Sequence, residues 1–196
     1  MKTLLEMTDI ELVMEFQRGK ENCFDELVKR HMEKATRLAF VTVGNYEEAR
    51  DISQEAFIKT YRALKGFQFK SKFSTWFYRI LMNTAKDHLR TKALKKMIGW
   101  KTREDMEVFF EKVADKSFSA SYEILGQETE QKISEVMRGL PNKQKWVFTL
   151  RFLEEMSIDE ISQVTGMAEG TVKATIHFAM QKFKEGLSSY LAEGRK

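Results

Sequence analysis

A row of cationic and amide side chains recurs at helical spacing in the middle of the chain. Arg79, Asn83, Lys86 and Arg90 follow one another at intervals of four, three and four residues, and Thr75 lies four residues before them. This spacing puts the side chains on one face of a helix. Arginine and lysine on that face can contact phosphates, and an asparagine amide can pair with a base edge. The row therefore predicts a nucleic-acid contact.

Aromatic residues lie next to this basic row. Phe67 and Phe69 fall in a loop that begins with a glycine, and Trp76 lies at the border of the polar face. Aromatic rings beside a basic groove suit the stacking of unpaired bases, which is worth roughly 1–3 kcal/mol per base. Aromatics at helical spacing are more often core residues, and we assign Phe73 and Phe77 to the core for that reason.

A second polar row lies near the end of the chain. Ser157 and Glu160 have the spacing of a capping box that starts a short helix, and Gly166 can end it. The helix after Gly166 buries an apolar line and turns a polar row outward. That polar row consists of Thr171, Lys173, His177 and Gln181. The pattern favours a helix-turn-helix whose second helix reads a DNA major groove, over an ordinary helical hairpin with a solvated face.

A third polar group, Asp51, Gln54 and Glu55, lies away from the buried line of its own helix. Acidic residues near a helix start also complement the helix dipole, so a solvated, well-capped helix is the plain interpretation of this group. The residues alone assign no function to this group.

Catalytic and metal chemistry find little support. The histidines His31, His88 and His177 are scattered, no paired carboxylates recur, and no glycine loop could cradle a phosphate. The one cysteine, Cys23, cannot form an internal disulfide or a structural zinc site, and its apolar surroundings predict a core position. We therefore expect no enzyme, no cofactor and no metal. No signal peptide or membrane-spanning run is evident, so we expect a cytoplasmic protein without membrane insertion.

The elements that must position these groups are helices. One proline, ten glycines and 42% hydrophobic residues leave few breaks between apolar runs. The apolar period and capping signals predict the following helices: one capped by Thr8 and ending near Gly19, one through Phe24–Ala39 that stops at Gly44, one from Asn45 to Leu64, one from Phe73 to about Arg90, then Glu128–Leu140, Asn142–Leu153 and the helix-turn-helix pair. The predicted fold is all-α.

Charge divides the chain. Basic residues dominate from Arg79 to Arg103, and acidic residues dominate from Glu104 to Glu135. A basic block followed by an acidic one indicates two surfaces with different roles. We predict two small helical domains, at residues 1–94 and 128–196, joined by a flexible, charged and largely acidic linker at residues 95–127.

Taken together, these stretches resemble an extracytoplasmic-function sigma factor, a compact member of the major bacterial sigma family. The resemblance covers about Glu21 to Leu187. Glu47–Phe57 is similar to the helix that docks on the clamp helices of RNA polymerase. Phe73–Ile80, with the polar residues that follow, is similar to the promoter-melting helix. Leu140–Lys173 is similar to the domain that reads the −35 element and rests on the polymerase flap.

The resemblance implies roles for individual residues. Core polymerase would be contacted by Asp51, Gln54 and Glu55. The −10 element and its non-template single strand would be contacted by Phe67, Phe69, Trp76, Arg79, Asn83, Lys86, Asp87 and Arg90. The −35 duplex would be contacted by Thr171, Lys173, Ala174, His177 and Lys182. The resemblance further implies an anti-sigma factor as a partner, and a Glu104–Asp115 segment that mimics RNA in the basic exit channel.

One part departs from the family pattern. After Gly170–Lys173 the family usually has a serine, an arginine and, three positions later, a second arginine. Here these positions hold Ala174, Thr175 and Phe178. Either the −35 element is read through fewer contacts, or Phe178 packs on a partner such as an anti-sigma factor, or Phe178 is half-buried against a neighbouring helix.

A rival function belongs to another class. A helix-turn-helix repressor or activator with a helical sensory or dimerisation domain would form a dimer and bind its operator without polymerase. It gives no reason for the basic row beside loop aromatics.

Overall fold

The computed structural model describes residues 3–97, 135–137 and 139–193. Within these residues the chain forms helices, turns and connecting segments, and contains no strand. The expected all-α class is confirmed. None of the helices in this part of the chain is both long and apolar enough to cross a membrane.

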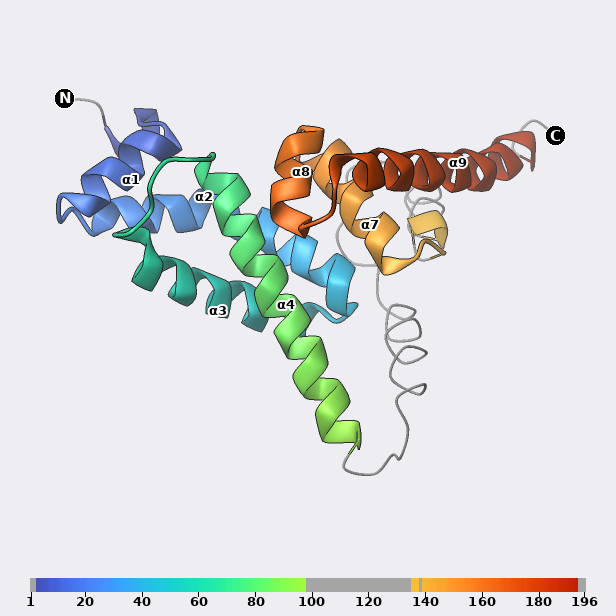
Figure 1. Cartoon of the computed structure of the whole chain (residues 1–196), viewed down its shortest axis with the longest axis horizontal. Helices are drawn as coiled ribbons and strands as arrows, with labels where there is room; N and C mark the ends of the chain where they lie inside the picture. The colour runs from blue at the N-terminus through green and yellow to red at the C-terminus, as the bar shows by residue number, and fades with distance from the viewer. Residues whose placement is uncertain (1–2, 98–134, 138, 194–196) are drawn as a thin grey trace.

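The N-terminal helices form the first bundle (Figure 1). Their bounds are η1 Leu4–Glu6, α1 Asp9–Gln17, α2 Asn22–Val43, α3 Tyr46–Leu64 and α4 Phe73–Met97. Local signals set these ends. Thr8 and Glu11 make the predicted capping box of α1. Gly44 ends α2 in the left-handed conformation with φ 70°, and the Asn45 side chain then accepts from Glu48 N at 3.0 Å to start α3.

The C-terminal helices are α7 Asn142–Phe148, a π-helical turn η3 Thr149–Leu153, α8 Ile158–Thr165 and α9 Glu169–Glu193. Ser157 and Glu160 form the predicted capping box of α8, and Gly166 ends it with φ 74°. The apolar line predicted for α9 points inward, because Val172 and Ala179 are fully buried. This pair of helices has the helix-turn-helix form that the sequence predicts.

The first bundle is held by an aromatic core. Phe73 and Phe77 are 1% and 0% exposed, as expected, and Phe77 stacks on Phe57 of α3 with ring centroids 4.4 Å apart. Cys23 is also fully buried, as its apolar surroundings predict. The buried line of α3 is likewise as expected: Ala49, Ile52, Ala56, Thr60 and Leu64. Burial of one stripe on each helix leaves the opposite stripe for contacts with other molecules.

Helix α4 differs from the sequence prediction in two ways. It continues to Met97 rather than ending near Arg90. It also buries a second stripe, which the periodicity did not predict, consisting of Thr75, Tyr78, Met82, Ala85 and Leu89. The extension has a physical cause. Glu48 at the start of α3 pairs with His88 at 3.2 Å and with Lys92, so an ion-pair cluster holds the second half of α4 against α3.

The two groups of helices pack on one another. Helix α8 contacts α4 and α7 contacts α2, and Figure 1 shows α8 beside the N-terminal half of α4. Buried residues of both groups belong to one continuous core cluster. The first residues of the expected linker, 95–97, belong to α4, and its remainder, with the acidic segment Glu104–Asp115, lies outside the described residues. Most of the helix expected at Glu128–Leu140 also lies outside them.

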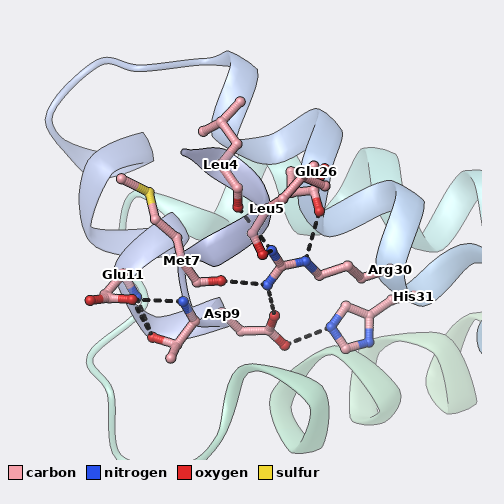
Figure 2. Close-up of polar contacts among 9 residues, drawn as sticks. Leu4, Leu5, Met7, Asp9, Glu11, Glu26, Arg30 and His31 are labelled. Atoms are coloured by element: carbon pink, nitrogen blue, oxygen red, sulfur yellow. Dashed lines mark hydrogen bonds and ion pairs between the residues drawn. The ribbon is translucent and has the colours of Figure 1, made fainter. Parts of the chain in front are cut away.

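Arg30 of α2 fastens the start of the chain to the first bundle (Figure 2). Its guanidinium donates to main-chain carbonyls of η1 and the next turn and to carboxylates of α1 and α2. The acceptors are the carbonyl oxygens of Leu4, Leu5 and Met7 and the carboxylates of Asp9 and Glu26, at 2.7–3.3 Å. His31 Nε2 lies 2.7 Å from the other oxygen of Asp9. This cluster fixes η1 and α1 relative to α2.

Candidate polymerase and nucleic-acid interfaces

The acidic group of α3 lies on the surface. Asp51, Gln54 and Glu55 are exposed, while Ile52 and Ala56 between and beside them are buried. Glu55 pairs with Lys59 one turn later at 2.8 Å. The helix that carries the group is fixed at its start by the Asn45 cap, so the three side chains are presented on a rigid support. An exposed acidic and amide stripe of this kind suits a partner with a basic surface.

The start of α3 is also fixed electrostatically. Burial alone would raise the pKa of Glu48, but the hydrogen bonds and charges of Lys92 and His88 outweigh burial and lower that pKa. Glu48 therefore carries its charge throughout the neutral range, and the contact between α3 and α4 persists there.

The basic row of α4 is largely as predicted, with one correction. Arg79, Asn83, Lys86 and Arg90 are exposed, as is Asp87. Thr75, expected to continue the row, is instead 2% exposed. Its position on the second buried stripe removes it from any direct contact with DNA. The row that remains spans about three turns of helix, from Arg79 to Arg90, at 3.6 residues per turn.

The loop aromatics form a cluster against α4 rather than standing free. Phe67 is 8% exposed, and its ring centroid lies 5.0 Å from that of Phe69 and 4.9 Å from that of Trp76. Phe69 and Trp76 are partly buried, and Phe69 has a positive φ of 57°. Gln17 of α1 holds the loop by donating to Leu64 O and Phe67 O, each at 3.0 Å. Of the predicted stacking residues, Phe69 and Trp76 therefore offer accessible ring surface, and Phe67 supports them.

The polar row of α9 faces solvent. Thr171, Lys173, Ala174, His177 and Lys182 are all exposed. Lys173 has a weak ion pair with Glu169 at 3.8 Å, so its ammonium group is available to another anion. In the turn before α9, Ser162 Oγ donates to Met167 O at 2.7 Å, which fixes the angle between α8 and α9. The arrangement presents one polar helix face on a capped, rigid hairpin.

Phe178 is 56% exposed on α9, and its ring lies 5.9 Å from that of His177. It is not buried against a neighbouring helix, which removes one of the three explanations for its place in the sequence. Thr175 Oγ1 donates to Thr171 O at 2.7 Å and so turns back to its own helix. Fewer cationic contacts to DNA, or a partner that covers Phe178, are the explanations that remain.

Sequence reasoning missed a set of residues that join the two groups of helices. Tyr78 Oη donates to Glu154 Oε2 at 2.8 Å, and burial together with that carboxylate raises the pKa of Tyr78 well above its usual value. Lys72 pairs with Glu160, and Lys86 lies over the ring of Trp146. Each contact is a single pair between distant parts of the chain, so no periodic pattern in the sequence predicts it.

No group of three or more histidine, cysteine, aspartate or glutamate side chains that could hold a metal ion occurs among the residues that the structure describes. The surfaces built here are suited to binding: an acidic stripe on α3, a basic row with aromatics on α4, and a polar helix face on α9.

Comparisons with known proteins identify the family of the chain. The model of sigma-70 region 2 matches residues 27–94, and the model of sigma-70 region 4 matches residues 130–183. The RNA polymerase sigma-H factor of Pseudomonas aeruginosa is 36% identical over 191 residues, which cover 97% of this chain and 99% of that protein. The ECF RNA polymerase sigma-E factor of Escherichia coli K12 is 34% identical over 179 residues, 90% of this chain and 92% of that protein.

Solved structures agree with the fold. The sigma factor RpoE of Bartonella quintana, solved in complex with the anti-sigma factor NepR, matches with a TM-score of 0.67 at 18% identity over 84% of this chain and 96% of that chain. CnrH, solved with the cytosolic domain of CnrY, matches with a TM-score of 0.60 at 19% identity over 91% and 96%. At these identities the likeness concerns the fold. Both sigma-70 models match, and relatives above 30% identity span nearly the whole chain, so this protein belongs to the extracytoplasmic-function sigma factors of bacterial RNA polymerase.

Proposed function

We propose that this sigma factor binds core polymerase through the α3 stripe, opens and captures the −10 element through α4 and its aromatic cluster, and reads the −35 element through α9. The observation that carries the proposal is that each of these three helices turns a polar row to solvent. In this function the protein is a specificity subunit that works in the cytoplasm with the polymerase and carries out no chemistry itself.

Each surface has a stated task. On α3, Asp51, Gln54 and Glu55 would meet a basic patch of the polymerase clamp helices. On α4, Arg79, Lys86 and Arg90 would neutralise phosphates, while Asn83 pairs with a base edge and Asp87 accepts from an exocyclic amine. Phe69 and Trp76, supported by Phe67, would stack on a base that has left the duplex.

The second group of helices would read duplex DNA. Thr171, Lys173 and His177 lie on the exposed face of α9 at the spacing that fits a major groove, with Ala174 beside them as an apolar contact for a thymine methyl group. Lys182, farther along the same helix, would contact a phosphate. The same group would rest on the polymerase flap.

An anti-sigma factor is a proposed further partner. The sigma factor RpoE of Bartonella quintana, which has a similar fold, was solved in complex with the anti-sigma factor NepR. The exposed Phe178 supplies an apolar contact point for a partner of this kind.

The test is reconstitution. The purified protein is added to bacterial core polymerase, and transcription is measured from a library of candidate promoters. We expect a stable complex with core and initiation at a subset of promoters. Absence of both the complex and the transcripts would contradict the proposed function.

A matched pair of variants tests the docking surface. Asp51→Ala removes a carboxylate from the α3 stripe, and we expect it to weaken core binding by about tenfold, the effect of losing one charge-assisted hydrogen bond. Asp25→Ala removes an exposed carboxylate from α2 and should leave core binding unchanged. Equal effects of the two variants would show that net charge, rather than this stripe, sets the affinity.

A further inference from the structure

Helix α9 carries a narrow stripe of small and apolar side chains on its outward face. Thr171, Ala174 and Phe178 follow one another at intervals of three and four residues, which places them within about 60° of one another around the helix. All three are exposed, and Phe178 is 56% exposed. The fully buried residues of the same helix, Val172 and Ala179, lie on a different side. The stripe is therefore a surface of its own rather than the edge of the core.

The side chains around Phe178 have no proton to donate to a base. Thr175 Oγ1 donates to Thr171 O at 2.7 Å, so its hydroxyl proton is used within the helix. Ala174 and Phe178 carry no polar group. From Ala174 to Phe178 the stripe thus offers methyl groups and one aromatic ring to whatever covers it.

Basic residues flank the stripe on both sides. Lys173 and His177 lie on one side of it and Lys182 lies on the other, and all three are exposed. A helix in a major groove needs this arrangement, because base edges form the floor of the groove and phosphates line its two walls. An apolar protein partner gives no reason for basic residues on both sides. The surface therefore fits duplex DNA.

The surface also has a defined end. Gln181 Nε2 donates to Glu185 Oε1 at 3.0 Å, and the carboxylate of Glu185 would repel phosphate. At the other end, α9 packs on α7 and α8, and Figure 1 shows that it extends away from the first bundle. The part of α9 that suits a groove is therefore Thr171–Lys182, about three turns of helix.

The residue types of the stripe decide which base pairs it suits. The thymine C5-methyl group is the apolar group of the major groove, and alanine, the threonine methyl and phenylalanine are the side chains that contact it. Guanine presents two acceptors, N7 and O6, which arginine commonly reads. A phenyl ring that covers these acceptors leaves them without a donor, at a cost in free energy. The stripe therefore favours A·T pairs whose thymines face it over G·C pairs.

We propose that Phe178, with Ala174 and Thr175 beside it, reads thymine methyl groups in the −35 element, so that thymine rather than guanine is specified at these positions. The inference rests on the proposed function, in which α9 lies in the major groove of this element. It goes further by naming the base, the chemical group on the base and the side chain that contacts it. Phe178 is in this view a specificity residue of the promoter contact.

The first test removes the methyl group alone. The holoenzyme, formed with bacterial core polymerase, selects its −35 element from a randomised promoter library, and each −35 thymine of the selected site is then replaced by deoxyuridine. Uracil pairs as thymine does, so only the C5-methyl group is lost. We expect about fourfold weaker binding for at least one −35 position, the effect of one buried methyl group. Deoxyuridine in the spacer between the two elements is the control and should change nothing.

A matched pair of variants assigns the contact to one ring. In Phe178→Ala the uracil penalty should disappear, since the ring that meets the methyl group is gone. Phe152→Ala removes another exposed ring, which lies in η3 rather than on α9, and should keep the full penalty. Circular dichroism checks that both variants are folded.

A third arm returns the methyl group on a different base pair. The sensitive thymine is replaced by cytosine and then by 5-methylcytosine, whose methyl group occupies the corresponding place in the groove. We expect 5-methylcytosine to bind about fourfold more tightly than cytosine in the wild-type holoenzyme, and equally with cytosine in Phe178→Ala.

A holoenzyme that is insensitive to uracil at every −35 position would overturn the proposal, as would a selected −35 element without thymine. A uracil penalty that Phe178→Ala keeps would overturn it too, and unchanged promoter binding of that variant would then indicate a protein partner for the ring. Failure of the holoenzyme to form or to select any −35 sequence would contradict the proposed function, and the inference with it.

Discussion

Arg30 ties the start of the chain to α2 through five acceptors, three of them main-chain carbonyls. Its replacement by an apolar side chain leaves partly buried carbonyls and two carboxylates without their donor. We expect Arg30→Met to lower the free energy of unfolding by about 2–3 kcal/mol. The measurement is urea unfolding followed by circular dichroism.

Arg37→Met provides the control. The Arg37 side chain is 25% exposed, the same as that of Arg30, but it pairs with Glu33, whose side chain is 89% exposed. We expect a loss below about 0.5 kcal/mol for this variant, as for other surface ion pairs. Similar losses of unfolding free energy in both variants would show that the aliphatic part of the Arg30 side chain, and not its hydrogen bonds, stabilises the cluster.

The stability that Asp9 contributes to the same cluster depends on pH. Burial by itself would raise the pKa of Asp9, but the hydrogen bonds and charges of His31 and Arg30 outweigh it and lower the pKa below the usual 3.8. A lowered folded-state pKa stabilises the protein fully above the unfolded pKa, and this contribution disappears as pH falls through the folded value.

We therefore expect wild type and Asp9→Asn to differ in stability at neutral pH and to converge below about pH 3.8, where the carboxylate becomes protonated in the unfolded chain and then in the native one. Urea midpoints measured for both proteins across the acid range check this. A difference that stays constant with pH would mean that Asp9 acts through packing rather than charge.

On α4, substitutions of Asn83 and Lys86 should have different effects on promoter binding. In the holoenzyme, Asn83→Ala should change the preferred base in the −10 element, because it removes an amide that reads a base edge. Lys86→Ala should weaken binding to all promoters evenly and lower the salt slope by about one, because it removes a phosphate contact. Selection from a randomised −10 library and a salt titration separate the two effects; a change of base preference in Lys86→Ala would contradict the assignment.

At the scale of the element, α9 offers a test of its unusual surface. Phe178→Arg supplies a cation at an exposed site on the proposed −35 face. We expect tighter binding of −35 duplexes and a salt slope steeper by about one phosphate contact. Phe152→Arg is the control, since Phe152 is also exposed, at 42%, but lies in η3 rather than on α9.

If Phe178 serves a protein partner instead, Phe178→Arg will weaken the complex with an anti-sigma factor and leave duplex binding no stronger than Phe152→Arg does. The two variants therefore separate the explanations that the exposed ring leaves open.

Helix starts and ends were predictable where one residue type dictates the local geometry. The Thr8 and Ser157 boxes, the Asn45 cap and the left-handed glycines Gly44 and Gly166 all lie where the sequence indicates. These signals act within one turn of chain, so neighbouring residues suffice to read them.

The errors on α4 have a different origin. The sequence pattern places Thr75 on the basic row and ends the helix near Arg90, and the structure differs on both points. Burial of Thr75 depends on elements that pack on a second side of α4, and the extension to Met97 depends on the Glu48 cluster of another helix. Neither cause is visible in a periodic pattern of α4 itself. The roles of the polar rows in binding stay predictions, since exposure alone does not identify a partner.

At the scale of the whole molecule, the polar contacts between α4 and residues 146–160 contribute small terms of opposite sign. A hydrogen bond to a charged group contributes about 1.5–3 kcal/mol, a cation–π contact about 0.5–1 kcal/mol, and an exposed ion pair about 0.2–1 kcal/mol. Thr75 Oγ1 and Trp146 Nε1, which are buried without a hydrogen-bond partner among the residues that the structure describes, cost about 1–3 kcal/mol each. These polar terms largely cancel, so the net stability of this contact comes from the apolar core that the two groups share.

This balance also explains why sequence reasoning could not fix the relative position of the two groups. Each polar contact between them is one pair of side chains far apart in the chain, and the second buried stripe of α4 was not evident in its periodicity.

The π turn η3 has a consequence for how residues 146–160 meet α4. Trp146 and Glu154 are eight residues apart, and in an unbroken α-helix eight residues leave two side chains about 80° out of phase. A π turn absorbs one extra residue, as Glu154 N donating to Thr149 O shows, so the pair behaves like positions seven apart, within about 20° of alignment. One inserted residue thus brings the indole and the carboxylate to the same side of their helix, and its loss would turn Glu154 and the residues after it by about 100° relative to Trp146.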